Sequence, residues 1–330
     1  GKGNIWISDP SKPSFWKFDV TKEEFQSYEY NGKTSVFLTI DGDGKIWFVD
    51  TPNSTIGFLE PETEKITLIP LPMEAIAIAL QPDLNDNIWI ALVDKHILLK
   101  YDQINDKFSE HPLPTTPAGP AALSRDSSGN IWFAESQSGK IGLIDPNSGE
   151  IKEFMPDDPM KEPFALFFDK HENLWIAEHT GLGIIKFNPF LKTFSKFSVP
   201  DPNSLPFGMT SDKYGNIWFA QHTVDKLGIY DPDNDNLIEI DIPTQQSFTQ
   251  FVVSDDNENV WFVEQRGNKL GKIEISESPN VSVTTKNISK PSLKYAQLVA
   301  PLISAGIIAT SLFFVKTIHD KRRIDSLVRG

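Results

Sequence analysis

Four short runs of apolar residues recur along most of this chain, each bounded by Gly, Pro, Asn or Asp. The clearest mark of the repeat is tryptophan, because seven of the eight tryptophans are spaced by 41 to 43 residues. They are Trp6, Trp47, Trp89, Trp132, Trp175, Trp218 and Trp261. A period of about 40 to 45 residues with four strand-like runs is typical of a β-propeller blade. The pattern therefore predicts an all-β fold, a seven-bladed β-propeller of four-stranded antiparallel blades.

The residues from 163 to 200 give one blade in full. We expect its strands A, B, C and D at Pro163–Phe168, Leu174–Glu178, Ile184–Phe187 and Thr193–Phe197. Seven equivalent tryptophans cannot all belong to one site, so we expect them to pack between blades. The propeller is predicted to cover residues 1–286, with a last strand at Val281–Thr285. Trp6 lies too close to residue 1 for a preceding strand A, and we expect that strand in an upstream segment that could also include a signal peptide.

After the last predicted strand the repeat stops and the chain changes character. A linker at residues 287–294 leads to residues 295–315, which carry no charge, and 21 helical residues span about 30 Å, the thickness of a bilayer core. We expect a transmembrane helix at 295–315, followed by a basic cytoplasmic tail at 316–330. The propeller would then be extracytoplasmic on a single-pass protein of the cell membrane. Three glycosylation sequons at Asn53, Asn280 and Asn287 fit an exported domain.

Composition limits the possible functions. The 330 residues include 45 Asp and Glu against 31 Lys and Arg, a formal net charge of −14. Nucleic acid is therefore not expected as a partner. The chain has no Cys, which excludes disulfides, thiolate metal sites and a cysteine nucleophile. Acidic turns such as Asp231–Asn236 resemble the start of a calcium loop but lack its glycine and its final glutamate, so we interpret them as Asx turns.

Two recurring phrases carry a family resemblance. Gly129–Glu135 reads GNIWFAE, and the phrase that begins at Lys140 reads KIGLIDP, followed by IKEF from Ile151. Together they resemble the streptogramin B lyase (virginiamycin B lyase) family, over residues 1 to about 285. The resemblance implies a seven-bladed propeller and, in the family's enzymes, a metal-assisted elimination that opens a cyclic ester. It also implies a catalytic histidine at the start of a strand A. Eleven residues before each tryptophan from Trp47 onward stand Val36, Ile78, Ala121, Phe164, Phe207 and Gln250, none of them histidine.

The candidate site lies where the B strands end, because the B–C turns and D–A connections of a propeller share one face. This predicted binding face consists of Asp50, Asp94, Glu135, Glu178, His179, Gln221, His222, Glu264, Gln265 and Arg266. His179 and His222 are 43 residues apart, one repeat in phase, so we expect them to be neighbours. With Glu178 they could act as acid and base, or the two histidines could hold a divalent metal. Alternatively, the carboxylates belong to the repeat and cap the B–C turns.

Two function classes remain open. We favour a non-catalytic binding or scaffold module, a subunit of a membrane protein complex that meets other membrane subunits through the propeller face and the transmembrane helix, with no cofactor expected. The bilayer is its second partner. The alternative is an enzyme, a metal-dependent carbon–oxygen lyase or lactonase that acts on a cyclic ester through His179, His222 and Glu178.

Overall fold

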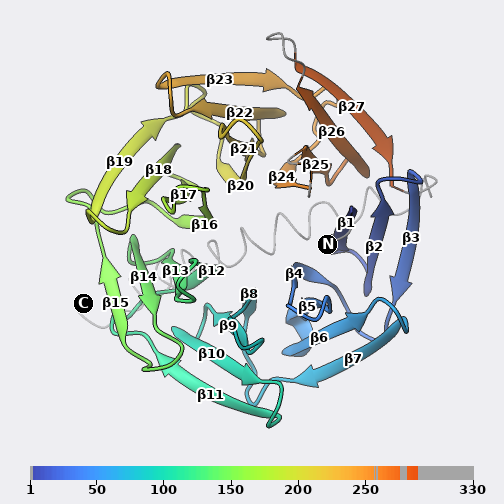
Figure 1. Cartoon of the computed structure of the whole chain (residues 1–330), viewed down its shortest axis with the longest axis vertical. Helices are drawn as coiled ribbons and strands as arrows, with labels where there is room; N and C mark the ends of the chain where they lie inside the picture. The colour runs from blue at the N-terminus through green and yellow to red at the C-terminus, as the bar shows by residue number, and fades with distance from the viewer. Residues whose placement is uncertain (1–2, 256, 258, 276–280, 289–330) are drawn as a thin grey trace, which may run out of the picture. The chain divides into compact units, whose positions relative to one another are not determined.

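The computed structural model describes residues 3–255, 257, 259–275 and 281–288. Figure 1 shows antiparallel sheets arranged as blades around a centre, in chain order from blue to orange. The described residues form seven sheets, which confirms the predicted seven-bladed propeller. Six sheets have four strands, and the sheet of blade 1 has three.

The strands follow in sequence order within every blade, and strand A is innermost in blades 2 to 7. Blade 1 is built from β1 (Asn4–Asp9), β2 (Ser14–Asp19) and β3 (Glu24–Glu29). Blade 2 contains β4 (Val36–Ile40), β5 (Ile46–Asp50), the 3-10 helix η1 (Thr51–Asn53), β6 (Thr55–Glu60) and β7 (Lys65–Pro70). Blade 3 contains β8 (Ala77–Pro82), β9 (Ile88–Leu92), β10 (Ile97–Asp102) and β11 (Lys107–Pro112). Blade 4 contains β12 (Pro120–Arg125), β13 (Ile131–Glu135), β14 (Lys140–Ile144) and β15 (Ile151–Phe154).

The remaining three blades carry the histidine pair and its neighbours. Blade 5 contains β16 (Pro163–Phe168), β17 (Leu174–Glu178), β18 (Gly183–Asn188) and β19 (Thr193–Ser198). Blade 6 contains β20 (Pro206–Ser211), β21 (Ile217–Gln221), β22 (Lys226–Asp231) and β23 (Asn236–Asp241). Blade 7 contains β24 (Thr249–Ser254), β25 (Val260–Glu264), β26 (Lys269–Ile275) and β27 (Val281–Asn287). The predicted strands of blade 5 are confirmed to within one residue, and the last strand ends two residues beyond the predicted Thr285.

The repeated tryptophan packs between blades, as predicted. Trp218 of blade 6, for example, shares a buried cluster with Val260 and Phe262 of blade 7. The indole N–H of each tryptophan from Trp47 to Trp261 donates to an aspartate six residues earlier, at 2.8 to 3.1 Å. That aspartate also caps the A–B turn, so one side chain fixes the turn and the indole together.

The glycine of the second phrase has a packing cause. A Cβ atom on Gly228 would lie 1.9 Å from Cζ of Phe219 on the neighbouring strand, so the phenyl ring rests directly on the glycine backbone. Gly142 and Gly271 stand in the same relation to Phe133 and Phe262. Both phrases therefore describe the blade framework rather than a site.

Every complete blade has a register shift between strands A and B, close to the start of strand A. In blade 5 the pairing passes from Pro163 to Ala165, which leaves Phe164 as the extra residue. The same shift in blade 6 lies between Pro206 and Met209 and contains Phe207. A β-bulge of this kind bends the strand and re-aims the side chain of the extra residue. In blades 3 to 7 the shift thus includes the position eleven residues before the tryptophan, whereas in blade 2 it follows that position, because Val36 pairs with Val49.

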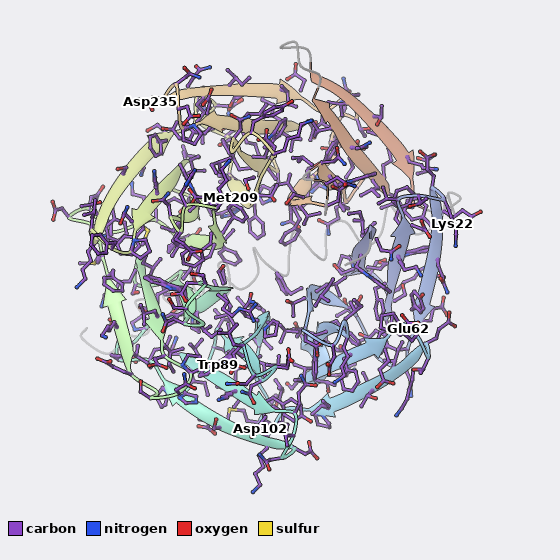
Figure 2. The ribbon with its side chains drawn as sticks, in the orientation of Figure 1. Lys22, Glu62, Trp89, Asp102, Met209 and Asp235 are labelled. Carbon is purple, nitrogen blue, oxygen red and sulfur yellow. The ribbon has the colours of Figure 1, made fainter. Side chains whose placement is uncertain are left out.

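Within the described residues, no helix is long and apolar enough to cross a membrane. The predicted transmembrane span, 295–315, and the basic tail, 316–330, lie outside the described residues, as does most of the predicted linker. Figure 2 labels Lys22, Glu62, Asp102 and Asp235 at the outer edge of the ring, in contrast to Met209 on the innermost strand β20.

Candidate functional site

The B–C turns and the D–A connections do lie on one face. The backbone N–H of His179 donates to Glu162 O at 3.1 Å, and that of Arg266 donates to Ser247 O at 3.0 Å. In blade 4, Ser136 N–H donates to Gly119 O at 3.0 Å. Each of these bonds joins a B–C turn to the D–A connection that precedes the same blade. The predicted residues therefore share a face.

The carboxylates that end the B strands hold these connections in place. Asp50 is buried and accepts the backbone N–H of Lys33 at 2.9 Å and the Nδ2–H of Asn53 at 2.8 Å. Glu178 is also buried, accepts Lys161 N–H at 2.7 Å and pairs with Lys196. Asp94 of blade 3, which is half-buried, accepts Ile76 N–H at 2.7 Å. Three of these bonds fasten D–A connections, at Lys33, Lys161 and Ile76, and the Asn53 bond is the one of this set that caps a B–C turn, the role given in the alternative interpretation.

Burial narrows the predicted binding face. Glu135, Gln221 and Glu264 are fully buried, and neither amide atom of Gln221 makes a hydrogen bond within the described residues. Burial raises the pKa of Glu135 to about 7, and the neighbouring Glu153 carboxylate adds to this shift. A ligand on the surface cannot reach these three side chains without a rearrangement. Of the predicted residues, Asp94, His179, Gln265 and Arg266 keep exposed or partly exposed surface.

The two histidines are neighbours, as their spacing predicts. Nε2 of His179 lies 3.2 Å from Nε2 of His222, with the two rings almost perpendicular at 86°. His222 is buried, stacked on one side with Phe207 and on the other with Phe248 at 4.8 Å between centroids. His179 contacts Phe207 and Phe164, at 5.7 and 5.9 Å. The two bulge residues thus enclose the histidine pair with aromatic carbon.

The contacts of the pair favour one assignment of its protons. Nδ1 of His179 lies 3.6 Å from Glu162 Oε2, and a carboxylate there favours a proton on Nδ1. Nε2 of His179 then accepts a hydrogen bond from the Nε2–H of His222. Nδ1 of His222 is left as a buried lone pair with no hydrogen bond in the described part. Burial lowers the pKa of His222 to about 3, and the charges of His179 and Arg266 act in the same direction. The His179 hydrogen bond lowers the pKa of Glu162.

Phe248 and Asp225 of this cluster were not identified from the sequence, and Arg266 was identified without its contact to Phe248. Phe248 stands thirteen residues before Trp261, where Gly119, Glu162 and Leu205 stand in other blades, and all four have positive φ. Asp225 fixes the connection that carries Phe248, since it accepts the N–H groups of Gln246 and Ser247 at 2.6 and 2.7 Å. The Arg266 guanidinium lies 4.4 Å above the Phe248 ring. The signal in the sequence was that Phe248, an aromatic residue, stands at the repeat position that holds Gly119 in blade 4.

The family resemblance implies a divalent metal, and His179 and His222 are the nitrogen donors that could bind it. Two imidazole nitrogens bound to one metal at about 2.1 Å are roughly 3.3 Å apart, which the histidine pair satisfies. A catalytic site needs a third protein ligand. No group of three His, Asp or Glu residues placed to hold a metal occurs in the described part of the chain. Two nitrogens alone do not fit a resident metal ion.

The other predicted positions are the three sequon asparagines and the acidic turn at Asp231. Asn53 is exposed in η1 and Asn287 is exposed at the end of β27, whereas Asn280 lies outside the described residues. Asp231 accepts the N–H groups of Asp233 and Asn234, which is the Asx turn expected for that acidic loop. The glycosylation of the two asparagines stays a prediction.

Comparison with known proteins agrees with the propeller. The structure of streptogramin B lyase superposes with a TM-score of 0.75 at 22% identity, covering 86% of this chain and 90% of that one. A catalytically inactive variant of virginiamycin B lyase from Staphylococcus aureus with quinupristin superposes with a TM-score of 0.69 at 22% identity, covering 79% and 85%. A putative 6-phosphogluconolactonase from Bacteroides fragilis gives 0.68 at 12% identity, covering 88% and 96%. At these identities the likeness shows the fold alone.

No curated protein sequence matches the chain. The family description "Virginiamycin B lyase family" does match, over residues 2–189 and 191–292. These ranges cover most of the chain and all seven blades. The chain therefore belongs to the virginiamycin B lyase family.

Proposed function

We propose that this protein is a non-catalytic binding module, a propeller that holds a partner on the face of the B–C turns in blades 5 to 7. One observation carries the proposal: the two bulge positions beside the histidines are Phe164 and Phe207, which neither transfer protons nor bind metals. The neutral, stacked His222 acts in this arrangement as a flat packing surface. Phe164 is partly exposed whereas Phe207 is buried, and partly exposed aromatic side chains are enriched at binding faces.

The rest of the proposal comes from the sequence. The uncharged stretch at residues 295–315 supports a membrane anchor, and the sequons support an extracytoplasmic propeller. We propose other membrane protein subunits as partners, with the bilayer as the second contact. A scaffold role within a membrane complex follows from this arrangement.

A second candidate is an enzyme of the lyase or lactonase type. The proximity of His179 and His222, with Glu162 orienting the first, favours it, because an oriented imidazole is a general base. Of the two histidines, only His179 has surface exposed to a substrate, so it would be the base in such an enzyme. Incubation with quinupristin, followed by chromatography for a ring-opened product, tests this candidate directly. A His179-dependent product would replace the binding proposal.

The binding proposal is tested on the full-length protein in its own membranes. Extraction in mild detergent and native electrophoresis with mass spectrometry should place wild-type protein in a defined complex. Phe251→Ser changes a 43% exposed aromatic residue beside Phe207, and Phe190→Ser changes a 90% exposed residue in the C–D turn of blade 5, at the opposite end of the strands. We expect Phe251→Ser to release the partner and Phe190→Ser to retain it. Wild-type migration alone, or equal retention by both variants, would contradict the proposal.

A further inference from the structure

Arg266 is a cation with a fixed position and a free binding edge. It lies in the B–C turn of blade 7, where its backbone N–H is bonded to Ser247 O, and its side chain is exposed. Its guanidinium stacks on Phe248. Within the described residues it forms no ion pair with a carboxylate. Stacking restrains the guanidinium plane and leaves its N–H fork free to bind an oxyanion with two hydrogen bonds.

The cation stands at the end of a continuous stack of flat groups. Arg266 covers Phe248, which lies at 15° to His222, which in turn lies at 14° to Phe207. The stack therefore consists of the Arg266 guanidinium followed by three aromatic rings. Phe248 is held against His222 by the Asp225 carboxylate, which fixes the backbone just before it. The position of the cation is therefore set by the framework of blades 6 and 7.

Apolar surface continues from the stack toward the propeller axis. Phe251 packs against Phe207 at 5.2 Å and also meets Phe37 of blade 2 at 6.4 Å, so these side chains reach across from different blades. Phe37 and Phe164 are partly exposed, as is Phe251. Phe37 has φ of +52°, a left-handed backbone that bulky residues rarely adopt. The surface is thus aromatic over its width and cationic at one edge.

We propose that this surface binds a small amphipathic anion, a ring-containing organic acid whose apolar body lies on Phe251 and whose carboxylate is bound by Arg266, both of blade 7. Charge complementarity selects the anion, because Arg266 is the exposed cation at the edge of the aromatic patch. Sulfonates and phosphate monoesters share the same binding chemistry. The inference rests on the proposed binding function and names the class of ligand for that face.

The test uses 6-fluoro-2-naphthoate and its neutral carboxamide as probes, followed by ¹⁹F NMR at pH 7 with the full chain in lipid nanodiscs. We expect the acid to bind wild-type protein at least tenfold more tightly than the amide. Arg266→Gln should reduce acid binding to the level of the amide, and Arg266→Lys should restore part of it. Phe251→Ala should weaken both probes equally. Phe190→Ala and Lys95→Gln, a cation in the B–C turn of blade 3, should change neither.

Equal affinity for acid and amide in wild-type protein, or acid binding that survives Arg266→Gln, would overturn the inference. The two proposals can fail separately. If neither probe binds while Phe251→Ser still releases the native partner, the binding function stands and the ligand class is wrong. If the probes bind as expected while the native complex is indifferent to both phenylalanine variants, the ligand class stands and the scaffold role is wrong.

Discussion

Blades 4 and 6 have the same framework and differ at the face. Their B strands read IWFAE and IWFAQ, and both tryptophans are clamped by an aspartate in the same way. In blade 4 the bulge residue is Ala121 and the residue after the B strand is Ser136. In blade 6 these positions hold Phe207 and His222, which stack. These two positions therefore account for the difference between blade 4, which stays outside the histidine cluster, and blade 6, which contributes to it.

The largest expected effect concerns the buried histidine of blade 6. The pKa of His222 is about 3 in the folded protein against about 6.5 when unfolded, so the unfolded chain binds more protons between these values. Stability should be fully present above pH 6.5 and fall by about 4 to 5 kcal/mol as the pH approaches 3. Urea unfolding of the His222→Phe variant should show a flatter pH dependence. His171→Gln, which changes an exposed histidine, should keep the wild-type slope, and identical slopes for wild type and His222→Phe would contradict this.

The buried carboxyl of blade 4 should show the opposite sign. The folded pKa of Glu135 is about 7 against about 4.5 unfolded, so the folded protein binds more protons in that range. Glu153 and Lys140 are the charged groups beside it. Wild-type protein should lose about 3 kcal/mol as the pH rises from 4.5 to above 7. Glu135→Gln, which copies Gln221 of blade 6, should remove that loss, measured by urea unfolding at pH 5 and pH 8.5. An equal loss in both proteins would be evidence against the assignment.

The framework that the two blades share can be tested in blade 5. Asp169 accepts the indole N–H of Trp175 at 2.8 Å and the backbone N–H groups of His171 and Asn173. Asp169→Ala leaves these donors unpaired and should cost about 2 to 3 kcal/mol in urea unfolding. Asp233→Ala, in the exposed C–D turn of blade 6, is the control and should cost less than about 0.5 kcal/mol. Similar costs for both would mean that the clamp is not what fixes the blade.

The smallest effect is expected from calcium. Asp231 already caps its own turn through the N–H groups of Asp233 and Asn234 and through Nδ2 of Asn234. These bonds lower the pKa of Asp231 and satisfy its carboxylate without an ion. Millimolar calcium should therefore leave the thermal midpoint unchanged within error. A calcium-dependent rise that Asp231→Ala abolishes would show that the acidic turns bind the ion.

The sequence predicts the framework well because each repeat restates it. The tryptophan spacing places the strands of blade 5 within one residue, and the in-phase spacing of His179 and His222 predicts their contact. The repeat could not show which polar residues near the ends of the B strands are buried. Glu135 and Arg266 are both polar residues near a B–C turn, yet the first is buried and the second is exposed. Nor could it show the stack of Arg266 on Phe248, which depends on a left-handed residue in an irregular connection. The framework consists of residues that recur in every repeat, whereas the candidate site consists of residues at which the repeats differ.

The β-bulge at the head of each complete blade has a geometric consequence. Because the ring is a repeat closed on itself, one period along the chain is one step around the axis, at the same height and with the same orientation. The blade number therefore sets the direction, around the propeller axis, in which a side chain at the bulge points. Moving the phenylalanine and histidine pair by 43 residues would carry it to the next blade, where it would still need partners such as those that Glu162 and Phe248 supply here. The fold therefore sets the direction of the pair by the blade that carries it, whereas the irregular connections supply its neighbours.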